Sequence, residues 1–242
     1  MSALLAVEGI SKRFRGLLAV ANANFEVNPR DIFAIIGPNG AGKTTLFNVI
    51  SGALRPDAGT IAFCGQRIDG LAPDVVCRRG IGRTFQIVRP FPALTVLDNV
   101  TVGALLHHAD VGDAARRADE VLRRLDLHRL RQQRADSLTL PDRKRLEVAR
   151  ALATDPKLLL LDEVMAGLRP TETDRMVAIL RDINRDSGLA IVLIEHVMRA
   201  VMALARRVVV LHHGAAIAQG APEEVVRNPA VIHSYLGAED VA

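Results

Sequence analysis

Aromatic residues are scarce in this sequence of 242 residues, which has no tryptophan, one tyrosine and seven phenylalanines. The arginine-rich segment 116–134 contains none of them, and its arginines are interleaved with aspartate and glutamate. Proteins that bind single-stranded nucleic acid stack the bases on aromatic side chains. The net charge of +4 is too small to decide the matter by itself. We therefore predict a solvated helix face in this segment, and no nucleic acid among the partners.

Cysteines are few, and long apolar runs are missing. Cys64 and Cys77 form neither a CxxC pair nor a Cys/His cluster, so we interpret them as reduced packing residues. The longest apolar stretches, such as 158–161 and 190–194, fall far short of the roughly 18 residues that span a bilayer. Residues 1–9 lack the basic and apolar regions of a secretory signal. These absences predict a cytoplasmic chain whose association with a membrane is peripheral.

Short apolar runs alternate with helical patterns along the chain. We expect strands at 31–36, 158–162, 190–194 and 207–211. Continuous apolar strands separated by helices are typical of a parallel sheet that is buried on both faces. The segment 97–134 has no such strand and is predicted to be helical. The pattern therefore predicts an α/β fold with an inserted helical subdomain.

A glycine-rich motif lies between the expected strand at 32–36 and an expected helix at 44–51. It fits G-x-x-x-x-G-K-[ST] and consists of Gly37, Pro38, Asn39, Gly40, Ala41, Gly42, Lys43, Thr44 and Thr45. Its glycines let successive N–H groups and the helix N-terminus point at phosphate oxygens. Lys43 can then reach the β- and γ-phosphates, and the Thr44 hydroxyl can bind Mg²⁺. The motif predicts a nucleotide phosphate site.

Acidic and histidine side chains follow two of the other expected strands. Asp162 and Glu163 end the leucine-rich strand at 158–162, at the edge where ligands collect in open α/β sheets. We predict that Asp162 holds Mg²⁺ and that Glu163 is the general base; the alternative is that both acids only cap the next helix. His196 follows the strand at 190–194 and is predicted to donate to the γ-phosphate, whereas alone it would be an ordinary surface or core histidine.

Together these residues resemble the ATP-binding cassette (ABC) family, and the resemblance covers nearly the whole chain. It implies that the protein binds ATP with Mg²⁺ and hydrolyses it. Gln86 matches the Q-loop glutamine, which touches magnesium or water and links the core to the helical subdomain. Phe14 matches the aromatic residue that stacks on adenine, although alone it would be read as a core phenylalanine. His196 and the segment 166–169 correspond to the family's H-loop and D-loop.

The resemblance also completes the predicted fold. It implies a P-loop NTPase core with a mainly parallel sheet, an N-terminal antiparallel β portion and an inserted helical subdomain. The whole chain would then be one nucleotide-binding domain, with its core at about 1–86 and 155–242 and its helical subdomain at about 87–154.

Within the family, the chain is most similar to the ATPase subunits of branched-chain amino acid importers, the LivG type. This finer resemblance implies a second ABC subunit, two transmembrane permease subunits and, indirectly, a substrate-binding protein, at the cytoplasmic face of the cell membrane. The stretches that carry it are Gly82 to Val88 with Arg89, Pro90 and Phe91, Arg143 to Ala153, Leu193 to Met198, and Asn228 to Gly237.

The segment Leu138–Asp142 departs from the family's signature loop, which usually reads Leu-Ser-Gly-Gly-Gln. Thr139 keeps the hydroxyl, but Pro141 has no N–H, and Asp142 adds negative charge where the partner's γ-phosphate should sit. One interpretation is a modified signature that still contacts ATP in trans through residues 139–142, Leu140 included. The other is a helix start, with Thr139 and Asp142 as a capping box and Pro141 in the first turn.

The sequence therefore predicts an ATP-hydrolysing ABC subunit that closes with a second cassette around ATP and drives a membrane transporter. Two alternatives stay open. The degenerate signature favours a regulatory cassette that binds ATP without useful turnover, whereas the intact Glu163 and His196 oppose it. A cassette that acts on DNA or ribosomes is disfavoured, because the chain has a single phosphate loop and no coiled-coil insertion.

Overall fold

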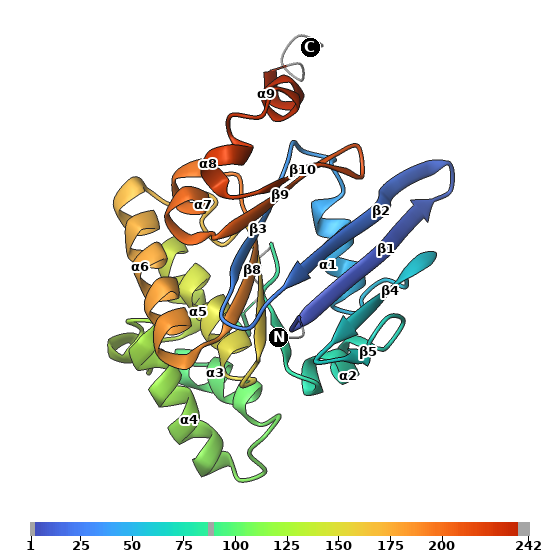
Figure 1. Ribbon diagram of the computed structural model, residues 1–242. Helices are drawn as coiled ribbons and strands as arrows, with labels where there is room; N and C mark the ends of the chain where they lie inside the picture. Colours follow the sequence, from blue (N-terminus) through green and yellow to red (C-terminus); the bar gives the residue numbers. More distant parts are fainter. Residues whose placement is uncertain (1–2, 87–89, 237–242) are drawn as a thin grey trace. The chain divides into compact units, whose positions relative to one another are not determined.

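Long half-buried strands form the start of the chain. The structure, a computed structural model, describes residues 3–86 and 90–236 and consists of two units (Figure 1). Residues 1–76 and 190–242 form the first unit, and residues 77–189 form the second. The boundary at residue 76 falls within α2 (Pro73–Arg78).

An antiparallel sheet opens the first unit, as predicted. Its strands are β1 (Leu5–Phe14), β2 (Leu17–Val27), β4 (Ala58–Phe63) and β5 (Gln66–Arg67), in the order β2-β1-β4-β5. On β1, Leu5, Val7 and Ile10 are buried while the end of the strand is exposed. This alternation is what a sheet with one covered face requires.

Fully buried strands form the centre of the first unit. β3 (Ile32–Ile36) runs parallel to β8 (Ala190–Ile194) on one side and to β9 (Arg207–His212) on the other, and β10 (Ala215–Gly220) pairs antiparallel with β9. Every residue of β3 and β8 is buried, which explains why these strands read as continuous apolar runs. The helices that follow the strands are α1 (Lys43–Ile50), α7 (Met198–Leu204), α8 (Pro222–Val225) and α9 (Pro229–Leu236).

The second unit combines a parallel strand pair with most of the helices. β6 (Ile81–Arg83) runs parallel to the fully buried β7 (Leu158–Asp162). The helices are α3 (Val96–Ala104), α4 (Val111–Arg124), α5 (Leu140–Leu152) and α6 (Pro170–Ser187), and 3₁₀ turns lie at His128–Leu130 and Ala135–Ser137. α3 packs against both α4 and α5 (Figure 1). The helical character predicted for 97–134 is confirmed.

The predicted fold class is confirmed: the chain is α/β, with mainly parallel buried strands and an N-terminal antiparallel sheet. The predicted strand boundaries hold to within one residue, since β3 starts at Ile32 rather than at residue 31 and β9 continues to His212. Among the helices of the described residues, none combines the length and the apolar character needed to cross a membrane.

Gly37 has to be a glycine in this fold. Its φ is 145°, and a Cβ at this position would overlap the carbonyl oxygen of Leu211. We expect Gly37→Ala to lower the free energy of unfolding by about 2 kcal/mol or more, because the clash is with backbone and adds to the strain. Gly40→Ala is the matched control, since Gly40 also has a positive φ, 79°, but no atom of the described residues lies within 4 Å of a Cβ there. Equal losses of stability in urea denaturation would show that the clash contributes nothing.

Candidate functional site

The glycine-rich loop of the first unit joins β3 to α1 and ends in a helix start that has no side-chain cap. Gly42, the N-cap of α1, adopts a left-handed conformation with φ 99° and supplies no side-chain hydrogen bond. The first turn of α1 contains no acidic residue. The partial positive charge of the helix N-terminus is therefore not compensated by a local side chain, which suits the binding of an anion.

Lys43 places its charge within the same loop. The side chain is only 7% exposed. Its Nζ donates hydrogen bonds to the carbonyl oxygens of Gly37, at 2.7 Å, and Pro38, at 2.9 Å. The ammonium thus lies over the loop rather than in solvent, and these residues fit a nucleotide phosphate.

Asp162 ends β7 in the second unit and is almost completely buried, at 1% exposure. Its N–H donates to the Thr84 hydroxyl at 3.0 Å, and Nη2 of Arg83 lies 3.4 Å from its carboxylate. Burial lowers the pKa of Arg83, and the charge of Asp162 opposes this effect. The ion pair compensates both charges in a place with little water. Arg83 was not among the predicted site residues.

Glu163 follows directly and has an unusual backbone. Its φ is 49°, in the left-handed region that residues with a Cβ rarely adopt. Its Oε2 accepts a hydrogen bond of 2.9 Å from Nε2 of Gln86. The structure therefore brings together two of the predicted site residues. A strained backbone next to a paired carboxylate is typical of a functional site.

Two buried charged residues of α5 lie in this region, and neither was among the predicted site residues. Nζ of Lys144 donates to the carbonyl oxygen of Glu163 at 2.9 Å. Glu147 pairs with Arg150 at 3.0 Å. Their spacing of three residues puts Lys144 and Glu147 on one face of the helix, which is the only signal that the sequence offered.

Phe14 and His196 belong to the first unit, with the glycine-rich loop. Phe14 lies at the end of β1 and is 43% exposed, so the alternative of a core phenylalanine is wrong. Lys12 Nζ lies 5.8 Å from the centre of its ring. His196 is exposed and follows the end of β8 by two residues. Both side chains are accessible to a ligand.

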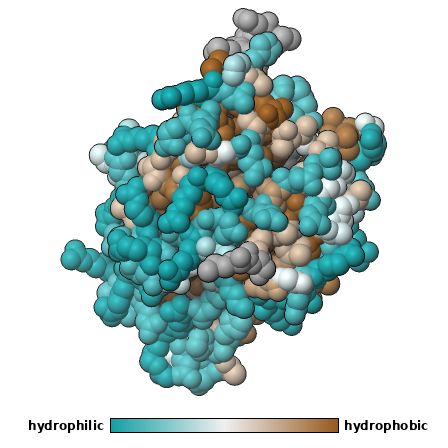
Figure 2. Space-filling view, in the orientation of Figure 1, coloured by the Kyte–Doolittle hydropathy of each residue, from teal (hydrophilic) through white to brown (hydrophobic). Residues whose placement is uncertain are grey.

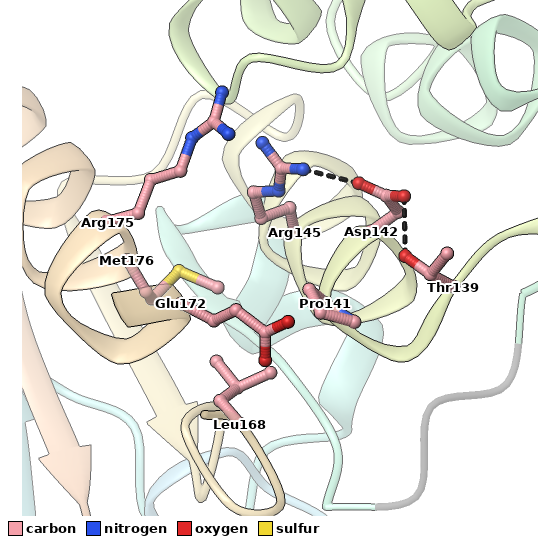
Figure 3. A pocket seen from close by; sticks show the side chains of 8 residues that line it. All are labelled: Thr139, Pro141, Asp142, Arg145, Leu168, Glu172, Arg175 and Met176. Atoms are coloured by element: carbon pink, nitrogen blue, oxygen red, sulfur yellow. Dashed lines mark hydrogen bonds and ion pairs between the residues drawn. The ribbon is translucent and has the colours of Figure 1, made fainter. Parts of the chain in front are cut away.

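The segment Thr139–Asp142 is the start of α5 (Figure 3). Thr139 is the N-cap, and Pro141 lies in the first turn, as the helix-start interpretation predicted. The predicted capping box is not formed, because the Thr139 hydroxyl donates to Asp142 Oδ2 at 2.6 Å instead of accepting from its N–H. The other oxygen of Asp142 pairs with Arg145. The carboxylate is thus turned toward its own helix.

A cavity of about 250 Å³ lies between the starts of α5 and α6 (Figure 3). Pro141 and Asp142 line one side, and Leu168, from the predicted D-loop, lines the other. Glu172 also faces the cavity, and its carboxylate accepts a hydrogen bond of 2.7 Å from the backbone N–H of Arg169. The structure therefore brings the predicted signature segment and the predicted D-loop to one cavity.

Comparison with known proteins gives consistent results. Residues 20–166 match the family "ABC transporter", and residues 217–241 match "Branched-chain amino acid ATP-binding cassette transporter". The chain is 40% identical to the high-affinity branched-chain amino acid transport ATP-binding protein LivG of Escherichia coli K12, over 97% of this chain and 98% of LivG. It is 37% identical to BraF of Pseudomonas aeruginosa, with the same coverage. The crystal structure of the ADP conformation of an ABC transporter cassette superimposes with a TM-score of 0.89, at 30% identity, over 98% of this chain and 100% of that one.

The chain belongs to the ABC transporter family. It is an ATP-binding cassette related to the ATPase subunits of branched-chain amino acid transporters. The predicted family resemblance, including its finer part, is confirmed. Residues 87–89 and 237, which were also among the carriers of that resemblance, lie outside the described residues.

Helix α9, which lies in the segment that matches the branched-chain amino acid group, lines a cavity of about 500 Å³ together with Pro38 and Asn39 of the glycine-rich loop. Burial raises the pKa of Tyr235 on α9, and a hydrogen bond with the Gly37 backbone opposes this effect. Apolar side chains gather on the surface over α9 (Figure 2), where Ile232 is exposed and lines a cavity of about 280 Å³ with Val226 and Tyr235. This helix and the glycine-rich loop thus lie side by side at one cavity.

The position of Lys43 leads to a direct test on nucleotide binding. We expect Lys43→Ala to weaken ATP binding by about tenfold or more, because the substitution removes the fixed positive charge of the loop. Lys157→Ala is the control, since this lysine is exposed and precedes β7 in the other unit. Affinity is measured by calorimetric titration with ATP and Mg²⁺. Near-normal binding by a folded Lys43→Ala variant would contradict the assignment of the loop.

Proposed function

We propose that this cassette is the ATP-hydrolysing subunit of an importer for branched-chain or related amino acids, and that ATP-driven closure of two cassettes energises transport. The observation that carries the proposed hydrolysis is the hydrogen bond between Gln86 and Glu163 at the end of β7. The identity of 40% with LivG over nearly the whole chain supports the class of substrate.

The predicted site residues would each have a distinct role in binding ATP and Mg²⁺. The glycine-rich loop and Lys43 hold the β- and γ-phosphates, and Phe14 stacks on adenine. Oxygen donors of Thr44, Asp162 and Gln86 are of the kind that Mg²⁺ takes. The ion supplies charge neutralisation at the phosphates when it is bound.

The chemical step itself would depend on two further side chains. Glu163 accepts a proton from the attacking water, and Gln86 orients that carboxylate through its amide. His196 donates a hydrogen bond to the γ-phosphate and so distinguishes ATP from ADP. The exposed position of His196 after β8 leaves its ring accessible for this role.

The relatives and the helical region support the proposed partners. Transport requires a second cassette, which is either a copy or a paralogue, and two permease subunits that span the membrane. A substrate-binding protein would deliver the amino acid to them. We place the cassette at the cytoplasmic face of the membrane, with α3, α4 and α5 as the helical subdomain that receives the permease.

A regulatory cassette without useful turnover is the alternative. The departure at Pro141, which removes one N–H donor from the trans contact, favours it. The paired Glu163 and Gln86 oppose it, because a cassette that only binds ATP has no need of a positioned base. We therefore retain hydrolysis as the proposed function.

Neutralising the proposed base separates binding from turnover. We expect Glu163→Gln to retain ATP affinity within about twofold and to lower the hydrolysis rate by about a hundredfold or more, because the amide cannot accept the proton. Phosphate release and calorimetric ATP binding are the two measurements. Hydrolysis at the wild-type rate would assign the base to another residue.

The same variant also tests closure. Because ATP bound between two cassettes favours the closed pair, ATP should shift Glu163→Gln toward the dimer in light scattering. Lys43→Ala, combined with Glu163→Gln, is the control that should not respond. An oligomeric state that ATP leaves unchanged, with candidate partners added, removes the support for closure.

The start of α5 gives a prediction for the trans contact. Replacing Pro141 by Gly and Asp142 by Gln restores an N–H donor and removes a negative charge. We expect the ATPase rate of the assembled transporter to rise by roughly threefold to tenfold, in line with one regained charge-assisted hydrogen bond. Circular dichroism controls for the lost contacts of Asp142 with Thr139 and Arg145. An unchanged or lower rate, with helix content intact, would show that the native segment is already a competent signature.

A further inference from the structure

Lys144 lies where lysines are rarely found, on the buried side of α5. Its side chain is 6% exposed. Its Nζ donates a hydrogen bond of 2.9 Å to the backbone carbonyl oxygen of Glu163. An ammonium group that leaves water needs such a partner, because burial without one is costly. The Lys144 side chain therefore links α5 to Glu163, the residue with the strained backbone.

The backbone of Glu163 needs to be held in place. A φ of 49° is unfavourable for a residue with a Cβ, and such conformations persist only where the surrounding structure fixes them. The hydrogen bond from Lys144 acts on the carbonyl of this same residue. Loss of the bond would allow the backbone to relax, and the carboxylate would then leave its place beside Gln86.

The same helix carries a second buried charge. Glu147, 5% exposed, lies one turn along α5 from Lys144 and pairs with Arg150 at 3.0 Å. Burial raises the pKa of Glu147, while the charge of Arg150 and the Phe85 N–H oppose this effect. α5 thus packs against both β6 and β7, the strands that precede Gln86 and Glu163.

We propose that Lys144 is a positioning residue for Glu163, through which α5 controls the geometry of the base. The inference rests on the proposed function, because it assumes that Glu163 acts as that base. Lys144 follows Asp142 by two residues in one continuous helix, Leu140–Leu152. A displacement of the first turn of α5 therefore moves the ammonium, and contact of that turn with a partner's nucleotide is transmitted to Glu163 of the same chain.

Lys144→Met tests the inference, because methionine has a similar shape but no donor. We expect kcat for ATP hydrolysis by the full-length chain to fall by about tenfold, with the KM for ATP changed by less than about twofold, since misplacing a base affects the chemical step and not the binding of substrate. Lys144→Gln retains an N–H donor and should recover part of the rate. Lys157→Met is the matched control, because this exposed lysine precedes the other end of β7 and should leave kcat unchanged.

A second background separates positioning from an independent effect. In Glu163→Gln, single-turnover hydrolysis should not fall further when Lys144→Met is added, because the residue that Lys144 positions can no longer act as a base. A further tenfold fall would overturn the inference by showing that Lys144 acts independently of Glu163.

The remaining outcomes are also decisive. An unchanged kcat of Lys144→Met, with normal loss in Glu163→Gln, overturns this inference and leaves the proposed function intact. Parallel losses of ATP binding, kcat and thermal stability, without recovery in Lys144→Gln, show a purely structural lysine and overturn it as well. A wild-type chain that does not hydrolyse ATP, alone or with partners, defeats the proposed function and this inference together.

Discussion

The parallel pairing of β6 with β7 is the constraint on which the arrangement in the second unit depends. Arg83 on β6 is in register with Leu160 on β7, so the two strands end at the same edge of the sheet. At this edge, Arg83 forms an ion pair with Asp162, and Gln86 donates a hydrogen bond to Glu163. Gly82 is needed for this register, because a Cβ there would press against the backbone of Ala151 at the end of α5. The strand pair and α5 therefore fix the acids together.

The helices α1, α5 and α6 differ in the charged side chains at their N-termini. α1 begins with an uncapped glycine and a buried lysine, and its first turn has no acid. α5 and α6 begin with Asp142 and Glu172, which bind groups of their own helices. Since an acid in the first turn already compensates the helix N-terminus, α1 is the one of these three helices that keeps its full attraction for a phosphate. The difference separates a site built for an anion from helix starts that are satisfied without one.

Much of the fold could be predicted from the sequence, because the buried strands are read from continuous apolar runs and the glycine-rich loop has a fixed spacing. Gln86 and Phe14 were found only through the family resemblance, since nothing in the local pattern distinguishes them. The contacts of Lys144 and Glu147 could not be predicted. A charged residue on a helix is normally solvated, and only tertiary packing shows that these two are buried against the backbone of other segments. The predicted capping box is not formed, because the Thr139 hydroxyl and Arg145 each bind one oxygen of the Asp142 carboxylate.

The contacts of Asp142 change the meaning of the degenerate signature. An unpaired carboxylate at this place would repel a phosphate, but here Arg145 and the Thr139 hydroxyl already bind it, so its net effect on an approaching anion is reduced. Pro141 is not compensated in this way, because no side chain restores a missing backbone donor. Under the proposed function, the weakness of the segment therefore lies in geometry more than in charge. Lys144 would also couple the position of this helix start to Glu163. A poor trans contact and a poorly held base would therefore both result from one position of α5.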